Sequence, residues 1–342
     1  MSEPARSVGS DDTRVTLVQV AKLAGVSPTT VSHVLSGKRW VAETTQATVR
    51  EAITQLGYRP NNVARSLRTR RSKMIAVVVP DITNTFYAVL TRGLADVMDE
   101  AGYGTYVCNT DSNPEREDAF MADVVDRGVD GVVMAAGDVT GDVGAGPGGL
   151  GVPAVRIGGD PDDDPRVDLV APDDEFGAHA AVRHLVDRGS RRIAIIEGPQ
   201  ASGSGRDEGY RRALAESGLP VDPDLMVRGD WTRPGGRTAM HELMALPVRP
   251  DAVFCANDLT AIGAIDAAHE LGLTVPGDVA VVGFDDVDAA TIVNPPLTTV
   301  RNPAYESGYT AGELLLSRIT GSYTGAGRTV VLPCLLVVRA SA

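Results

Sequence analysis

Near the N-terminus, hydrophobic residues recur at three- and four-residue spacing, which is the period of an α-helix. The pattern predicts three short helices, over 16–24, 28–35 and 42–56. Gly25 permits a sharp turn between the first two, because glycine tolerates positive φ. Ser27 and Pro28 form a helix start, since serine caps a helix and proline presets φ. The segment therefore predicts a helix-turn-helix.

On the second predicted helix, Val31, Val34 and Leu35 form the inward stripe. The outward positions of its first turns carry short hydrogen-bonding side chains, namely Thr29, Thr30, Ser32 and His33. An exposed polar face at the start of such a helix is typical of a surface that contacts another molecule.

From residue 73 the pattern changes to β-branched runs that alternate with helical periodicity. The predicted strands are 74–79, 104–109, 131–135, 192–197, 252–255 and 279–283, and the predicted helices are 85–101, 114–127, 176–188, 205–216, 234–245, 259–270 and 305–319. This alternation predicts an α/β fold with doubly wound parallel sheets. Two such sheets in series predict a ligand site between two lobes, where the carboxyl ends of the strands lie.

The charge distribution separates these two regions. Residues 14–73 hold eleven basic residues against Glu43 and Glu51, a net charge of +9, whereas the whole chain has a net charge of -13. A basic segment on an acidic protein favours a polyanionic partner at that end, because each neutralised phosphate releases counterions. A solvated charged surface is the alternative, and it explains the segregation poorly.

The remaining composition excludes several classes of protein. No apolar run reaches membrane length and the N-terminus does not resemble a signal peptide, so we expect a cytoplasmic protein without a membrane partner. Cys108, Cys255 and Cys334 are far apart, which predicts reduced packing thiols and no metal site. The five histidines are scattered, and we expect no cofactor.

Several motifs together carry a family resemblance. Val15 to Pro60, Ala64 to Arg68, and the run Ile75-Ala-Val-Val-Val-Pro-Asp81 resemble the lac-repressor/galactose-repressor family of bacterial transcription regulators. The segments 29–35 and 40–43 are most similar to its purine-repressor branch. The resemblance covers the chain after residue 14 and implies a helix-turn-helix headpiece, a hinge helix and a body like a periplasmic sugar-binding protein.

The resemblance implies a homodimer on a palindromic, double-stranded DNA operator. It suggests that Thr29 and His33 address base edges, while hydroxyls near the helix start meet phosphates. Leu67 matches a leucine that the family inserts between base pairs of the minor groove. The predicted DNA-binding residues are Ser27, Pro28, Thr29, Thr30, Ser32, His33, Tyr58, Ala64, Leu67 and Arg68. Pro28 departs from the family, which often has a base-contacting side chain there.

Small-molecule effector contacts are expected where strands end, at positions that match effector contacts in the family. An aromatic face, an arginine and carboxylates suit a polyhydroxylated or heterocyclic ligand. The predicted effector-binding residues are Asp81, Phe86, Tyr87, Arg206, Trp231, Asn257, Asp258, Phe284 and Asp285. Capping of the following helix is the structural alternative for Asp258.

The expected domains follow from these boundaries. They are a disordered tail at 1–13, a headpiece at 14–60, a hinge helix and linker at 61–73, and a body at 74–342. Within the body, we expect an N-lobe at about 74–173 and 301–322 and a C-lobe at about 174–298 and 328–342. The glycine-rich segment 141–151 cannot be helical and predicts a mobile loop.

The sequence therefore predicts a non-enzymatic repressor controlled by a small molecule, with a sugar as the commonest effector class of the family. A repressor of the same fold that responds to a purine or nucleoside is the alternative. A sugar-binding transport protein would need an export signal and no basic headpiece. An NAD-dependent enzyme is disfavoured because the glycines at 198–209 do not have the G-x-G-x-x-G spacing.

Overall fold

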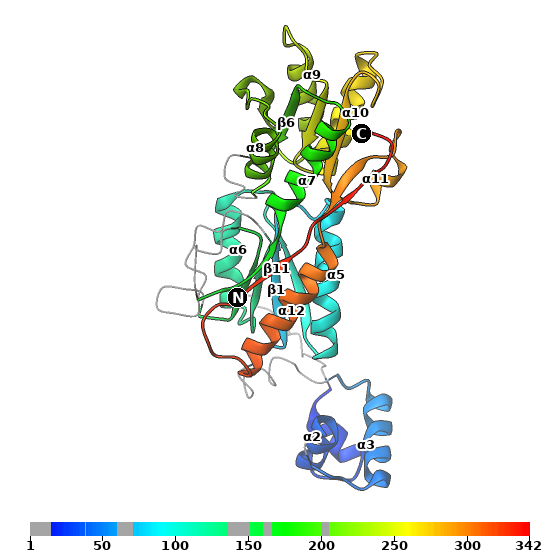
Figure 1. The fold of residues 1–342 in the computed structure, drawn as a ribbon. Helices are drawn as coiled ribbons and strands as arrows, with labels where there is room; N and C mark the ends of the chain where they lie inside the picture. The colour runs from blue at the N-terminus through cyan, green and yellow to red at the C-terminus, as the bar shows by residue number, and fades with distance from the viewer. Residues whose placement is uncertain (1–14, 38, 60–70, 136–150, 160–165, 200–204) are drawn as a thin grey trace, which may run out of the picture. The chain divides into compact units, whose positions relative to one another are not determined.

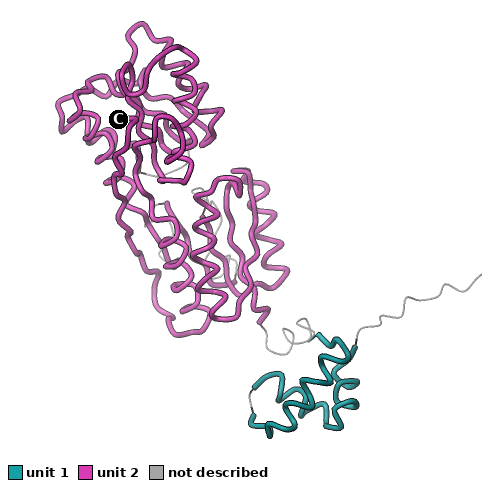
Figure 2. The backbone as a smooth tube through the Cα atoms, turned by 90° about the vertical axis from the view of Figure 1, so that its right-hand side faces the viewer, with its two compact units in different colours: residues 1–70 teal, residues 71–342 magenta. Residues whose placement is uncertain are grey.

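A computed structural model of the chain describes residues 15–37, 39–59, 71–135, 151–159, 166–199 and 205–342. The chain divides into two compact units, residues 1–70 and residues 71–342 (Figure 2). The predicted tail, the predicted hinge helix with Ala64, Leu67 and Arg68, and residues 141–150 of the predicted glycine-rich loop lie outside the described residues.

The first unit contains the three predicted helices, α1 (Leu17–Leu23), α2 (Pro28–Ser36) and α3 (Glu43–Leu56). The Thr16 side chain caps α1 and the Ser27 side chain caps α2. One small core joins the helices, with Val20, Val31 and Val49 fully buried. Leu35 departs from the prediction, because it is 39% exposed at the end of α2 instead of facing the core.

The first sheet of the second unit is parallel and has the order β11-β5-β4-β3-β1-β2. Its strands are β1 (Met74–Val79), β2 (Gly104–Asn109), β3 (Val132–Met134), β4 (Ala154–Ile157), β5 (Asp168–Pro172) and β11 (Thr329–Leu332). The helices α5 (Thr85–Glu100) and α12 (Ala304–Thr320) share a core with one face, and α6 (Pro114–Asp126) shares a core with the other.

The second sheet has the order β12-β10-β9-β8-β6-β7, and within it β12 is antiparallel to β10. Its strands are β6 (Ile193–Glu197), β7 (Met226–Arg228), β8 (Ala252–Cys255), β9 (Ala280–Asp285), β10 (Thr298–Arg301) and β12 (Leu335–Val337). The helices are α7 (Asp174–Asp187), α8 (Arg206–Glu216), α9 (Arg233–Met244), α10 (Asp258–Glu270), α11 (Ala289–Ile292) and a 3-10 turn at Pro223–Leu225. α7 and α8 pack on one face, and α9 and α10 pack on the other.

The chain passes between the two lobes three times, after β5, after β10 and after β11. The third passage corrects the expected lobe boundary at residue 328, because β11 pairs with β5 of the N-lobe. The crossing instead lies between Leu332 and Leu335, where β12 joins the other sheet. Figure 1 shows β11 and α12, from the end of the chain, among elements from the first half of the body.

Two glycines of α5 and α12 allow these helices to approach closely. A Cβ at Gly308 would lie 1.9 Å from the Leu90 carbonyl oxygen, and a Cβ at Gly93 would lie 2.1 Å from the Tyr305 carbonyl oxygen. Since both obstacles are backbone atoms, a larger residue would force the helices apart. The pair therefore forms a tightly packed support beside the first sheet.

Candidate DNA-binding and effector-binding sites

The start of α2 combines a firm cap with an exposed polar surface. The Ser27 Oγ accepts a hydrogen bond from the Thr30 backbone N–H at 3.0 Å and lies 2.9 Å from the Thr30 hydroxyl. Gly25 has a φ of 66°, which makes the sharp turn after α1 possible. Pro28 and Thr29 are exposed, and Thr30, Ser32 and His33 are half-buried. The predicted face therefore exists, with two of its hydroxyls partly engaged in the cap.

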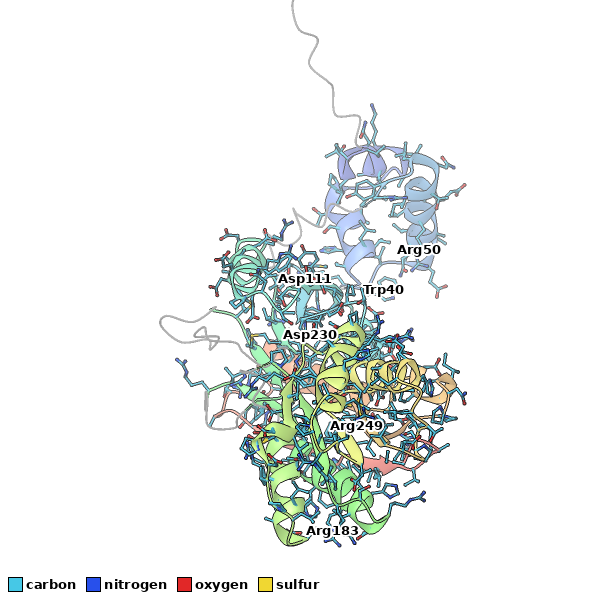
Figure 3. The ribbon with its side chains drawn as sticks, turned by 90° about the horizontal axis from the view of Figure 1, so that it is seen from above. Trp40, Arg50, Asp111, Arg183, Asp230 and Arg249 are labelled. Atoms are coloured by element: carbon cyan, nitrogen blue, oxygen red, sulfur yellow. The ribbon has the colours of Figure 1, made fainter. Side chains whose placement is uncertain are left out.

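Other side chains of the helical unit add charge and an aromatic surface. Lys22, Arg39 and Arg50 are exposed, and Trp40 is 88% exposed. Figure 3 labels Trp40 and Arg50 among the side chains of this unit. Tyr58 occupies a different environment, because it packs half-buried against the small helical core. Its side chain thus supports the helices, and any contact with DNA would involve only its exposed part.

Arg206 is the centre of the polar site in the body. It begins α8, is 8% exposed, and its Nε donates to the Asp174 carboxylate at 3.2 Å. Its Nη2 lies 3.6 Å from an Asp285 carboxylate oxygen, and its Nη1 donates to the Ala256 carbonyl. The guanidinium is therefore held by two carboxylates and a backbone oxygen, all of them from the C-lobe.

Aromatic rings flank this guanidinium. Its carbon lies 3.9 Å from the centre of the Phe284 ring and 5.4 Å from the Trp231 ring. Phe284 is fully buried, so it supports Arg206 and cannot present its ring to a ligand in this structure, contrary to the predicted contact. Trp231 is half-buried and packs on Gly198, where a Cβ would lie 2.1 Å from the indole.

The backbone of two of these residues is strained. Trp231 has a φ of 66° and Asp285 has a φ of 109°, in the region that residues with side chains seldom adopt. The Asn257 Nδ2 donates to the Trp231 carbonyl at 3.0 Å, and the Asn257 Oδ1 caps α10 by accepting from Thr260. Strain of this kind is concentrated at ligand-binding and catalytic sites, where the surroundings hold it in place.

Asp258 occupies a supporting position. It is 0% exposed, and its carboxylate accepts from the Val287 N–H at 2.8 Å and from the Thr299 hydroxyl. The cap of α10 is Asn257, so neither a direct ligand contact nor the capping alternative describes Asp258 here. Burial raises the pKa of Asp258 well above its ordinary value, and the nearby Asp285 raises it further.

Three predicted residues come from the N-lobe. Asp81 accepts hydrogen bonds from the Thr83 N–H and hydroxyl at 2.8 and 2.7 Å, and it is half-buried. The rings of Phe86 and Tyr87 meet edge to face at the start of α5, with centroids 5.2 Å apart. Burial raises the pKa of Tyr87, and the Asp285 carboxylate raises it further while Arg206 opposes the rise. Tyr87 therefore lies within electrostatic reach of the C-lobe cluster.

The two carboxylates beside Arg206 differ from ordinary surface groups. Burial raises the pKa of Asp285 to about 6, although Arg206 and a hydrogen bond from Asn302 lower it. Burial also raises the pKa of Asp174. Burial lowers the pKa of Arg206, but the two carboxylates raise it more, so the guanidinium stays charged. The site therefore holds one cation between two partly desolvated carboxyl groups.

Sequence reasoning missed Asp174 and Asn302. Asp174 follows β5 and Asn302 follows β10, so the rule that polar residues gather at strand ends could have found both. The Asn302 Nδ2 donates to Asp285 at 3.2 Å, while its buried Oδ1 has no hydrogen-bond partner. An unsatisfied acceptor beside the cluster adds to its capacity for a polar ligand.

Other chemistry has less support in the described parts of the chain. All three cysteines are free and buried, as predicted. No group of three or more His, Cys, Asp or Glu residues among the described positions could hold a metal ion. Within those same positions, no helix has the length and apolar character needed to cross a membrane.

A helix-turn-helix unit joined to a two-lobed α/β body with a buried polar site defines a ligand-responsive DNA-binding protein. Residues 16–61 match the model of bacterial regulatory proteins of the lacI family, and residues 182–342 match that of a periplasmic binding protein-like domain. The chain belongs to the lacI family of transcriptional regulators.

Relatives cover nearly the whole chain. The ribose operon repressor of Escherichia coli (strain K12) is 36% identical in an alignment of 335 residues that covers 94% of this chain and 98% of that protein. The repressor PurR of Photobacterium profundum is 34% identical over 313 residues, covering 89% and 92%. These relatives confirm the predicted family and its role in transcriptional regulation.

Solved structures agree with the predicted fold. The lac repressor dimer bound to operator and the anti-inducer ONPF has a TM-score of 0.86 at 28% identity, covering 96% of this chain and 99% of that one. The transcriptional regulator CelR in complex with cellobiose has a TM-score of 0.71 at 35% identity, covering 96% and 100%.

Proposed function

We propose that this regulator represses transcription as a homodimer on a near-palindromic operator, and that a sugar bound at the Arg206 cluster sets its affinity for DNA. The environment of Arg206 carries the effector part of this proposal. A protein that acts on chromosomal DNA in this way works in the cytoplasm.

In the DNA-binding part, α2 enters the major groove. Thr29 and His33 then contact base edges, and the Ser27, Thr30 and Ser32 hydroxyls contact phosphates near the positive end of the helix dipole. Pro28 contributes shape without a hydrogen bond. Leu67 is then the apolar wedge in the minor groove, with Ala64, Arg68 and the edge of Tyr58 as neighbouring contacts.

In the effector part, Arg206 and Asp285 hydrogen-bond vicinal hydroxyls of the sugar, and Trp231 packs on a face of its ring. A bidentate guanidinium paired with a carboxylate fixes both donors and acceptors of a polyol. Asn257 and the Tyr87 hydroxyl complete the polar contacts, and Phe86 and Asp81 form the N-lobe side. Phe284 and Asp258 position the contacting residues from behind.

Similar proteins favour sugars. One relative is named a ribose operon repressor, and two similar structures contain cellobiose and ribose. PurR relatives keep a purine as the second candidate. A purine base is flat on both faces and would be stacked, whereas the described cluster offers Trp231 as the one half-buried ring in contact with Arg206.

The ligand test is a thermal-shift and calorimetric comparison of D-ribose, cellobiose, D-glucose, hypoxanthine and guanine on the whole chain. We expect a sugar to raise the melting temperature of the unsubstituted chain and of Arg233→Met, whose ion pair lies on the surface. The same sugar should have little effect on Asp285→Asn. If only the purines raise the melting temperature, the effector is a purine and the sugar is ruled out.

The DNA test begins with selection of a duplex from a pool of randomised palindromes. We expect two subunits per duplex and a steep loss of affinity with salt, because phosphate contacts release counterions. His33→Ala should relax sequence preference at one position of each half-site, whereas Arg50→Ala, on α3, should leave that preference unchanged. A failure to select any sequence would refute specific recognition.

A further inference from the structure

One buried carboxylate in the N-lobe joins two arginines from distant parts of the chain. Asp168 is 0% exposed, and its oxygens accept from the Arg318 Nε and Nη2 at 2.8 and 2.7 Å. They also accept from the Arg328 Nη2 at 2.6 Å and from the Arg328 backbone N–H at 2.8 Å. Tyr323 lies against both guanidinium groups, at 4.9 and 3.9 Å.

The three residues belong to the three elements that connect the lobes. Asp168 begins β5, which leads into the first passage to the C-lobe, and Arg318 lies near the end of α12, which follows the second. Arg328 immediately precedes β11, which leads into the third. One ion cluster thus joins the three elements that lead into or out of the passages. It does so at the end of each element that lies away from its passage.

α12 links this cluster to the Arg206 site. Just before the helix begins, Asn302 donates to Asp285, which in turn lies beside Arg206. The helix then runs through 17 residues to Thr320. At a rise of 1.5 Å per residue this is about 25 Å, and along this length α12 packs closely on α5 at Gly93 and Gly308. One end of α12 therefore lies beside the Arg206 site, and the other end lies at the Asp168 cluster.

The last turn of α12 also holds the segment that leads to the DNA-binding unit. Arg71 donates to the Ile319 carbonyl at 2.7 Å, one residue after Arg318. The Asp130 carboxylate accepts from the Ser72 and Lys73 backbone N–H groups at 2.9 and 3.2 Å. The Lys73 ammonium lies 3.8 Å from the centre of the Tyr103 ring. Lys73 has a φ of 59°, so these contacts hold a strained backbone.

We propose that Asp168 is a positioning residue for regulation, which locks the three lobe connections to the end of α12 so that rearrangement at the Arg206 site moves the attachment at residues 71–73. The inference rests on the proposed function, since it supplies the physical link between effector and DNA. A buried ion cluster suits this role because separating its members leaves an uncompensated buried charge, which is costly.

The first test is tryptic cleavage after Lys73, followed by mass spectrometry of the fragment that begins at Met74. Trypsin can bind Lys73 only when its side chain leaves Tyr103 and its backbone leaves Asp130, so the rate reports opening of the attachment. We expect Asp168→Asn to accelerate this cleavage by about tenfold or more. Arg318→Lys should have a similar effect, and so should Arg328→Lys, because the Arg328 guanidinium also donates to the Leu314 carbonyl and the Ser317 hydroxyl of α12 at 3.2 and 2.8 Å.

Two control variants separate this effect from loss of stability. Val133→Ala removes core volume in the same lobe. It is assayed at the temperature at which its unfolded fraction equals that of Asp168→Asn. Asp266→Asn removes the partner of Arg233 on the C-lobe surface. Neither should accelerate cleavage after Lys73. Equal acceleration in Val133→Ala and Asp168→Asn would overturn the proposal, and so would a lack of acceleration in Asp168→Asn.

The second test measures coupling in the opposite direction. In a Trp40→Phe background Trp231 is the only tryptophan, so its emission reports the Arg206 site. Because coupling between two sites is reciprocal, the selected duplex should change this emission, and Asp168→Asn should abolish the change while a folded protein still binds DNA. An unchanged response in Asp168→Asn would refute the role of Asp168. Failure of the unsubstituted chain to bind any duplex would instead refute the proposed function, and the cleavage test would still decide on Asp168.

Discussion

Replacing Arg206 by Met is the most informative change to the effector site. Methionine has a similar length and fills the space between Phe284 and Trp231, but it has no charge and no donors. The substitution leaves the Asp174 and Asp285 carboxyl groups with 15% and 7% of their side chains exposed and without their common cation. The free energy of unfolding should therefore fall at neutral pH.

The size of the loss can be worked from the structure. Even with Arg206 present, burial raises the pKa of Asp285 to about 6 from an ordinary value of 3.8, so ionising it costs about 3 kcal/mol more in the folded than in the unfolded chain. That cost is already present in the unsubstituted protein, and removing one partner of a buried pair typically destabilises by about 3 to 5 kcal/mol, because the remaining charge is uncompensated. We expect a loss of this order for Arg206→Met at pH 8.

The pH dependence provides the decisive measurement. A carboxyl group whose folded pKa is raised stabilises the folded state when protonated, and this contribution is lost as pH rises through the folded pKa. Without Arg206 the pKa values of Asp174 and Asp285 rise further, so the deficit should shrink between pH 8 and pH 5.

Chemical denaturation at both pH values, with the surface variant Arg233→Met as control, measures the deficit. We expect the control to lose less than about 1 kcal/mol at either pH. A deficit in Arg206→Met that is the same at pH 5 and pH 8 would show that lost packing, and not stranded charge, accounts for the effect.

Three further predictions follow from the described contacts. Ser27→Ala should destabilise α2 by about 1 kcal/mol and weaken operator binding, as measured by thermal unfolding and fluorescence anisotropy, whereas Ser36→Ala at the other end should do neither. The emission of Trp40 should shift when duplex DNA is added to a Trp231→Phe variant, and an unchanged spectrum would place Trp40 away from the DNA. Affinity for a stabilising sugar, measured by calorimetry, should fall as pH falls through about 6, because protonation removes the charge on Asp285, and Asp285→Asn should bind the sugar weakly at every pH.

The sequence predicted the elements well because their signals are local. Ser27, Pro28 and Gly25 define the start of α2 and the turn before it, and the structure places the helix accordingly. Continuous β-branched runs such as Met74–Val79 became buried parallel strands. The short strands at Asp168–Pro172 and Thr329–Leu332 had weak periodicity, and their pairing depends on distant contacts that no local pattern records.

The sequence predicted which residues gather at the candidate site, but it did not predict which of them face a ligand and which support the others. Strand ends located Arg206, Trp231 and Asp285, which the structure brings together. Burial in the structure then distinguished residues that can contact a ligand from residues that support them. The Phe284 ring is buried against Arg206, and the buried Asp258 carboxylate already accepts a hydrogen bond from the Val287 N–H. Such packing depends on tertiary neighbours, so a residue type at a strand end cannot reveal it.

The three passages between the lobes have a consequence for how such regulators can be recombined. Neither lobe is a continuous stretch of chain. A single uninterrupted gene fragment that spans most of one lobe would therefore lack a strand or a helix of that lobe's core. The helical unit, in contrast, is contiguous and precedes the body in the chain. A single crossover in the gene between the two units could join the same effector-binding body to a DNA-binding unit of different sequence preference. An exchange of one lobe would instead require crossovers at each of the three passages.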